Sequence, residues 1–235
     1  MTLEELLQDG FAALQLPLDE AALRRYRLYY ETLSEKNRVM NLTAIEGEED
    51  TARLHFLDCA ALLTLCDFSG ARVIDVGSGA GFPGLALKIA RPEMDLTLLD
   101  SLDKRVKFLR ETDGLLGFED LRCVHARAEE APADFRQSFD FALSRAVARL
   151  NLLCELCLPF VKVGGRFVAM KGPGAAEELA EAKKAIRTLG GETERVEEYT
   201  IPGTEVTHTA VIIRKIADTP ARYPRRWAQM KKQPL

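Results

Sequence analysis

The sequence predicts an α/β fold: a mostly parallel sheet with an antiparallel last strand, preceded by a helical N-terminal extension. From about residue 70, short β-rich segments alternate with helical ones, which is the order that builds a parallel sheet. The first of these strands runs into a turn crowded with glycines. Two strands near the C-terminus are joined around Pro202-Gly203, close enough in sequence to pair antiparallel. We therefore expect five parallel strands closed by an antiparallel pair.

Residues 1–66 are predicted to be helical because their apolar residues recur at a spacing of about 3.6 residues. Asp19 is the expected N-cap of the second helix. The apolar positions are Leu3, Leu6, Leu7, Phe11 and Leu14 in the first helix, Leu23, Tyr26, Tyr30 and Leu33 in the second, and Leu54, Leu57, Ala61 and Leu65 in the third.

Residues 67–218 are predicted to form the sheet domain. A helix after the second strand is expected to turn Leu102, Val106 and Leu109 inward, and a charged helix over 175–189 is expected to stop at Gly190-Gly191. The strands are predicted over Arg72 to Val76, Leu96 to Leu99, Leu121 to His125, Phe139 to Leu143, Gly165 to Met170, Glu194 to Tyr199 and Thr207 to Arg214.

The charge of the chain is unevenly distributed. The 235 residues carry a net charge of −4, which taken alone argues against a nucleic-acid partner. Residues 219–235, however, carry +5 with three prolines and no acid, and their helix and strand signals are weak. Because this basic tail suits phosphate, the average charge does not exclude RNA. We expect its deletion to weaken RNA binding in a salt-sensitive way and to leave cofactor affinity unchanged.

The cysteines and the N-terminus predict a cytoplasmic protein. Five cysteines in a chain of this length do not form a secreted disulfide framework. The N-terminus is acidic where a signal peptide is basic, and no uncharged apolar run approaches the ~18 residues that span a bilayer. Cys154 and Cys157 have the spacing of a metal or redox pair, but no second pair completes a site, so we expect a buried helix and no metal.

The glycine-rich turn, from Val73 to Gly84, is the strongest local signal. Glycine lets the backbone adopt positive φ and approach a ligand closely, and this turn stands where open α/β sheets bind nucleotides. The pattern Gly79-x-Gly81-x-x-Gly84, with Asp100 21 positions after Gly79, also satisfies the dinucleotide motif. A nicotinamide-dependent oxidoreductase is therefore an alternative.

Three observations favour S-adenosylmethionine as the cofactor. Asp75 precedes Gly77 by two residues, which resembles motif I of class I methyltransferases. A carboxylate there suits a ligand with a sulfonium and an ammonium and repels a pyrophosphate. The closing antiparallel pair resembles the last strands of the Rossmann-like methyltransferase sheet. Asp75 has a second possible role, as a cap on the N–H groups of the following loop.

Two further acidic positions follow strands. Asp100 ends the second strand, where its carboxylate can accept hydrogen bonds from both ribose hydroxyls, and its alternative role is to cap the next helix. After the third strand come Arg127, Ala128 and Glu129, where this class of fold lays its backbone against adenine. The alternative for Glu129 is an acid in a first helical turn.

The motifs, taken in order, resemble the glucose-inhibited division protein B family, the RsmG-type methyltransferases of bacterial small-subunit ribosomal RNA. The resemblance covers nearly the whole chain and implies methyl transfer from S-adenosylmethionine to N7 of a guanine in 16S rRNA. The motifs are Asn41 to Ile45, His55 to Asp58, Asp75 to Gly84, Leu98 to Ser101 with Lys104-Arg105, Ser144 to Ala146, and Met170 to Gly172. The cofactor positions implied are Gly77, Gly79, Phe82, Asp100, Ser101, Ala128, Glu129 and Arg145.

Guanine N7 has a lone pair and no proton, so its methylation needs alignment and no general base. Arg145 follows the fourth strand, where it could donate to guanine O6 or pair with a cofactor or RNA group. A structural ion pair is its alternative, which suits Arg149 better. We expect Arg145→Ala to keep the fold and to lose most methyl transfer.

The predicted partner is small-subunit rRNA or its precursor particle, bound by a monomer. Basic side chains near the cofactor loop and in the tail are the expected RNA contacts, and a satisfied core or helix-surface role is the alternative for His55. A non-catalytic ribosome assembly factor with the same fold is the second alternative function. The RNA-contact positions are Asn41, His55, Lys104, Arg105, Lys171, Arg222, Arg225 and Arg226.

Overall fold

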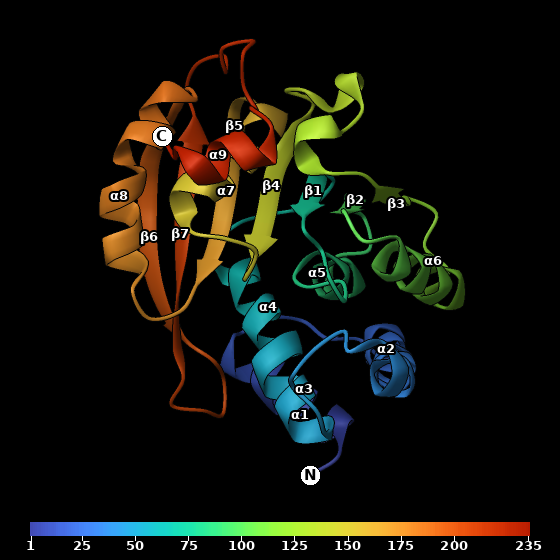
Figure 1. Cartoon of the computed structure of the whole chain (residues 1–235). Helices are drawn as coiled ribbons and strands as arrows, with labels where there is room; N and C mark the ends of the chain where they lie inside the picture. Colours follow the sequence, from blue (N-terminus) through green and yellow to red (C-terminus); the bar gives the residue numbers. More distant parts are fainter.

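The computed structural model describes all 235 residues and is built on one seven-stranded sheet, in the order β3-β2-β1-β4-β5-β7-β6 (Figure 1). The neighbours from β3 to β5 pair in parallel, and β7 pairs antiparallel with both β5 and β6. The predicted fold class is confirmed. The strands are β1 Arg72–Val76, β2 Asp95–Asp100, β3 Leu121–His125, β4 Phe139–Arg145, β5 Val161–Lys171, β6 Gly191–Thr200 and β7 Thr207–Lys215.

Helices cover both faces of the sheet. One apolar core joins the N-terminal helices, α5 and α6 to one face, and a second joins α7, α8 and the C-terminal segment to the other. No helix has the length and apolar character needed to cross a membrane. The helices are α1 Leu3–Ala13, α2 Glu20–Met40, α3 Glu48–Thr51, α4 Asp58–Ala60, α5 Gly84–Ala90, α6 Asp103–Leu116, α7 Leu150–Cys157, α8 Ala175–Thr188 and α9 Trp227–Lys232.

The N-terminal helices gather at the end of the sheet to which β4 points (Figure 1). Asp19 caps α2 as predicted, with its carboxylate accepting from the N–H of Ala22 at 2.7 Å. The predicted third helix is irregular, because a π-helical stretch, Ala52–Leu57, runs into α4. Tyr29, and not the predicted Tyr30, is fully buried on α2, and its hydroxyl donates to the carbonyl of Ala80. The helical extension therefore supports the glycine loop directly.

Two more predictions about buried faces have clear outcomes. Leu102 was expected to turn inward, but it precedes α6 as the N-cap and is 44% exposed, so that prediction is wrong. Cys154 and Cys157 are free thiols buried on α7, which confirms the predicted buried helix. Burial raises the pKa of both thiols, so they remain protonated and act as small apolar side chains.

The C-terminal segment, residues 219–235, is packed against the body of the protein despite its weak local signals. Tyr223 and Met230 belong to the second core, and Met230 is fully buried. The Arg136 guanidinium donates to the carbonyls of Thr219 and Tyr223 at 2.5 and 2.7 Å. Long-range contacts of this kind are invisible to local periodicity, and they make the segment part of the fold.

Candidate cofactor and substrate site

The glycine loop connects β1 to α5 by a backbone path that glycine makes possible. Gly77, Gly79 and Gly81 have φ of 76°, 59° and 103°, which side-chain-bearing residues adopt rarely. A Cβ on Gly77 would lie 2.5 Å from Cγ2 of Val147. The N–H of Gly77 donates to the Leu99 carbonyl at 2.8 Å, which ties the loop to β2.

Asp75 lies behind this loop, fully buried at the end of β1. Its Oδ2 accepts from the N–H of Gly84 at 2.8 Å, while Oδ1 has no partner. Of the two roles open to Asp75, the structure shows the cap on the loop. The side chain lines neither of the cavities beside the loop, so the predicted direct contact with the cofactor is not supported by its position.

Burial raises the pKa of the Asp75 carboxyl to about 7, and the Gly84 N–H opposes this only in part. As the pH rises from about 4 to about 7, the unfolded chain loses this proton while the folded protein keeps it, so this carboxyl makes folding less favourable. We expect Asp75→Asn to gain stability relative to the wild type over that range, by up to about 1.4 kcal/mol per pH unit. Urea unfolding of both proteins at several pH values measures the difference, and a pH-independent difference would contradict the prediction.

Asp100, at the end of β2, joins the loop to α6. Its Oδ2 accepts from the N–H of Gly79 and its Oδ1 from the N–H of Leu102, both at 2.9 Å. Arg105 approaches Oδ2 at 3.6 Å. Asp100 also lines the two cavities beside the loop, so it holds the loop in shape and is open to a ligand there.

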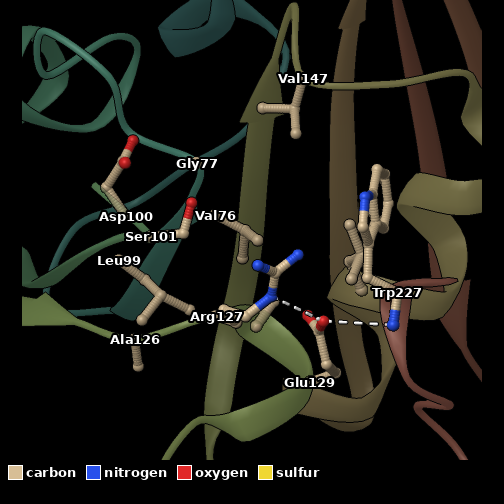
Figure 2. A pocket seen from close by; sticks show the side chains of 12 residues that line it. Val76, Gly77, Leu99, Asp100, Ser101, Ala126, Arg127, Glu129, Val147 and Trp227 are labelled. Atoms are coloured by element: carbon tan, nitrogen blue, oxygen red, sulfur yellow. Dashed lines mark hydrogen bonds and ion pairs between the residues drawn. The ribbon is translucent and has the colours of Figure 1, made fainter.

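The first cavity, of about 220 Å³, has mostly apolar walls (Figure 2). Glu129 lies at one side, where its Oε1 accepts from Arg127 Nε at 3.0 Å and from the Trp227 N–H at 3.2 Å. The segment Arg127 to Glu129 was predicted here, whereas Trp227 was expected to serve RNA as part of the tail. The lining residues are Val76, Gly77, Leu99, Asp100, Ser101, Ala126, Arg127, Ala128, Glu129, Val147, Leu156 and Trp227.

Two larger cavities continue the groove. The second, of about 470 Å³, shares Gly77, Asp100, Ser101 and Val147 with the first, and Phe82 also lines it. The third, of about 710 Å³, shares His55, Arg145, Ala146 and Val147 with the second. Because each cavity has walls in common with the next, the three form one line of sites across the glycine loop.

Arg145 stands where the second and third cavities meet, and it is largely buried. Its Nη1 donates to Oδ2 of the fully buried Asp58 at 3.0 Å, and its Nη2 donates to Nδ1 of His55 at 2.8 Å. The guanidinium also lies 4.9 Å from the centre of the Phe82 ring. Arg145 therefore makes the ion pair that the sequence analysis assigned to Arg149, and Arg149 makes its own with Glu181 at 2.8 Å.

His55 is a neutral part of this network. Burial, aided by the charge of Arg145, lowers its pKa to about 3. Since arginine can only donate, Nδ1 of His55 is the acceptor, and its proton lies on Nε2, which donates to Thr43 Oγ1 at 2.9 Å. The ring stacks on Phe82 with centroids 4.2 Å apart. His55 is therefore a buried histidine with both ring nitrogens hydrogen-bonded inside the protein, which was the alternative role given for it above.

Asp58 joins these residues to β6 and β7. Its Oδ1 accepts from the Tyr199 hydroxyl and from His208 Nδ1, each at 2.9 Å. The hydrogen bond to Asp58 raises the pKa of His208, whose side chain lines the third cavity. The sequence does not mark Tyr199 and His208 as partners of Asp58, because more than 140 residues separate them from it and no local pattern indicates such a contact.

The predicted RNA-contact residues have different surroundings. Two of them are paired inside the protein, so their predicted role as RNA contacts is corrected. Lys171 is buried against Glu178 and the Ala148 carbonyl, and Arg225 binds the buried Glu155. Asn41 ends α2 in the left-handed conformation with φ of 51°, and its side chain is exposed. Lys104, Arg222 and Arg226 are exposed, and Arg105 is half-buried beside Asp100.

Comparison with known proteins shows the family of this chain. The family model of GidB, described as rRNA small subunit methyltransferase G, matches residues 22–207. The chain belongs to the GidB family. A GidB relative named ribosomal RNA small subunit methyltransferase G, from Alkaliphilus oremlandii, is 44% identical over 100% of both chains. Another with that name, from Clostridium perfringens, is 42% identical over 98% of each chain. The family resemblance read from the sequence motifs is confirmed.

Solved structures support the fold independently. A 16S rRNA (adenine(1408)-N(1))-methyltransferase mutant from Catenulisporales acidiphilia has a TM-score of 0.53 at 15% identity, covering 64% of this GidB-family chain and 87% of its own. TYW2 from P. horikoshii, solved with MeSAdo, has a TM-score of 0.55 at 16% identity, covering 68% and 61%. At these identities the likeness concerns the class I methyltransferase fold alone.

Proposed function

We propose that this member of the rRNA small subunit methyltransferase G family transfers a methyl group from S-adenosylmethionine to N7 of a guanine in small-subunit rRNA. The observation that carries the proposal is the line of three cavities with shared walls. In this assignment the first holds adenine, the second holds the ribose and the methionine part, and the third receives the target base.

The residues beside the loop fit this cofactor. The loop glycines leave backbone where a Cβ would collide, and Asp100 offers carboxylate oxygens to a ribose. The Asp100 carboxylate, which lines both cavities beside the loop, favours a cationic ligand and disfavours the pyrophosphate of a dinucleotide. S-adenosylmethionine supplies an electrophilic methyl group on a positively charged sulfur.

The side chains around the third cavity suit a reaction that needs no general base. Asp58 already accepts from Arg145, Tyr199 and His208. His55 accepts from Arg145 and has its own proton engaged with Thr43. Neither Asp58 nor His55 is free to remove a proton, and N7 has none to lose. The chain then contributes alignment and exclusion of water, and alignment is worth ~7–11 kcal/mol of the barrier at best.

In this proposal His208, and not Arg145, binds the guanine base. Both Nη atoms of Arg145 are held by Asp58 and His55, which makes it a positioning residue at the junction of the cavities. His208 uses Nδ1 for Asp58 and keeps Nε2 for a ligand in the third cavity. A protonated Nε2 donates to an acceptor such as guanine O6.

The test is methyl transfer from labelled cofactor to unmodified small-subunit rRNA, followed by mapping of the methylated atom. We expect one guanine to be labelled, and the label to disappear when that guanine is replaced by 7-deazaguanine, which has C–H in place of N7. Label retained on 7-deazaguanine would contradict N7 as the target. The absence of any transfer, with naked rRNA, precursor particle and finished subunit all tried, would favour an assembly factor.

The proposed function also concerns the oligomeric state, the cellular location and the RNA-binding surface of the protein. We propose a monomer that acts in the cytoplasm. We propose that the exposed cations Lys104, Arg222 and Arg226 contact rRNA phosphates, together with Asn41 and Arg105 near the groove. Such contacts weaken as salt rises. We propose that the chain is divided into a helical extension over 1–66, a methyltransferase domain over 67–218 and a basic tail over 219–235.

A further inference from the structure

The C-terminal segment reaches the first cavity and supplies one of its walls. The indole of Trp227 lines the cavity, on the side opposite Asp100 and Ser101 in the view of Figure 2. The backbone N–H of Trp227 donates to Glu129, the residue at the adenine end in the assignment above. A basic tail outside this cavity would make neither contact, and both contacts bear on the expectation that deleting the tail leaves cofactor affinity unchanged.

Buried contacts hold Trp227 at this position. Glu155 on α7 is 1% exposed and accepts from the Arg225 N–H, Nε and Nη2 at 2.8, 2.8 and 2.6 Å. Tyr223 and Met230, on either side of Trp227 in the chain, are buried in the second core. An anchored indole loses little freedom when a flat ring packs against it, which is the condition under which aromatic contacts contribute most to affinity.

The chemistry of the cavity matches a purine. Its other walls are mainly Val76, Leu99, Ala126 and Leu156, which offer apolar surface and no hydrogen bonds. Oε1 of Glu129 is already shared by Arg127 and the Trp227 N–H. Beside the hydrogen bonds that the polar lining residues can make, stacking on the indole is the interaction that this cavity offers to the face of an adenine ring.

We propose that Trp227 stacks on the adenine of the cofactor, so that the C-terminal segment is a cofactor-binding element. The proposal rests on the assignment of S-adenosylmethionine to this groove. Because aromatic–base stacking is worth ~1–3 kcal/mol, Trp227→Ala weakens cofactor affinity roughly 5- to 150-fold. Trp227→Phe keeps an aromatic face and most of the affinity. The KM for rRNA stays unchanged in both, because the indole faces the cofactor cavity.

Fluorescence tests the proposal without any mutation, since Trp227 is the one tryptophan of the chain. Titration of the full-length protein with S-adenosylhomocysteine changes the Trp227 emission saturably, with the midpoint that calorimetry gives for the same ligand. Lys231→Ala, a change at an exposed residue of the same helix that lines no part of the cavity, is the matched control and keeps the wild-type Kd.

Two results would overturn the stacking role. One is constant emission while calorimetry shows the site filling, and the other is a folded Trp227→Ala variant that binds the cofactor as tightly as the wild type. Failure of the wild-type protein to bind either S-adenosylmethionine or S-adenosylhomocysteine in the calorimeter is a different result, because it refutes the cofactor assignment itself.

Discussion

Arg145→Ala is expected to lose methyl transfer and to unfold at a much lower urea concentration than the wild type. Asp58 is fully buried, and Arg145 is the arginine that pairs with it. Removing one partner of a buried ion pair leaves an uncompensated charge and costs about 3–5 kcal/mol. The sequence alone led us to expect that Arg145→Ala keeps its fold; the buried ion pair with Asp58 leads us to expect a less stable protein. Urea unfolding and labelled methyl transfer measure the two effects.

Two variants separate the stability effect from the catalytic one. Arg149→Ala, four residues away, breaks an exposed pair with Glu181 and is expected to leave the urea midpoint close to that of the wild type. The double variant Asp58→Asn with Arg145→Gln removes both charges, so it is expected to be more stable than Arg145→Ala and still inactive. An Arg145→Ala protein with the wild-type unfolding midpoint would contradict the structural role of the pair.

The fold was predictable because its signals are local. Strand and helix periods alternate along the chain, Asp19 sits next to the helix that it caps, and the glycine loop lies within twelve residues. The cofactor positions Gly77, Gly79 and Asp100 share this property, since the motif places them at the ends of adjacent strands. Residue type and short spacing are enough to place these side chains at one edge of the sheet.

The predictions that failed concern side chains whose partners no local pattern marks. Lys171 and Arg225 look like free cations locally, but Glu178 and the buried Glu155 neutralise them in the fold. The sequence predicts that Arg145 is available to bind RNA, but in the structure it is hydrogen-bonded to Asp58, which is 87 residues away. Charge counted along a chain shows how many cations exist, whereas tertiary pairing decides which of them remain available to an RNA.

Asp100→Ala is expected to reduce affinity for the cofactor at least about 100-fold. Two ribose hydroxyls would lose a charged acceptor, at ~1.5–3 kcal/mol for each such hydrogen bond. The same change leaves the N–H groups of Gly79 and Leu102 without their carboxylate, so the loop loses the contact that shapes it. Calorimetric titration with S-adenosylhomocysteine measures the loss.

Asp103→Ala is the matched control for Asp100. It lies three residues further along, it is exposed, and its carboxylate pairs with Lys107 at 2.7 Å without lining the groove. Asp100→Asn keeps one acceptor oxygen, and its affinity should fall between those of the wild type and Asp100→Ala. If Asp100→Ala bound as tightly as Asp103→Ala, the ribose would lie elsewhere, and the order of the three cavities would have to be reassigned. Cofactor affinity at this one carboxylate therefore tests the whole layout of the site.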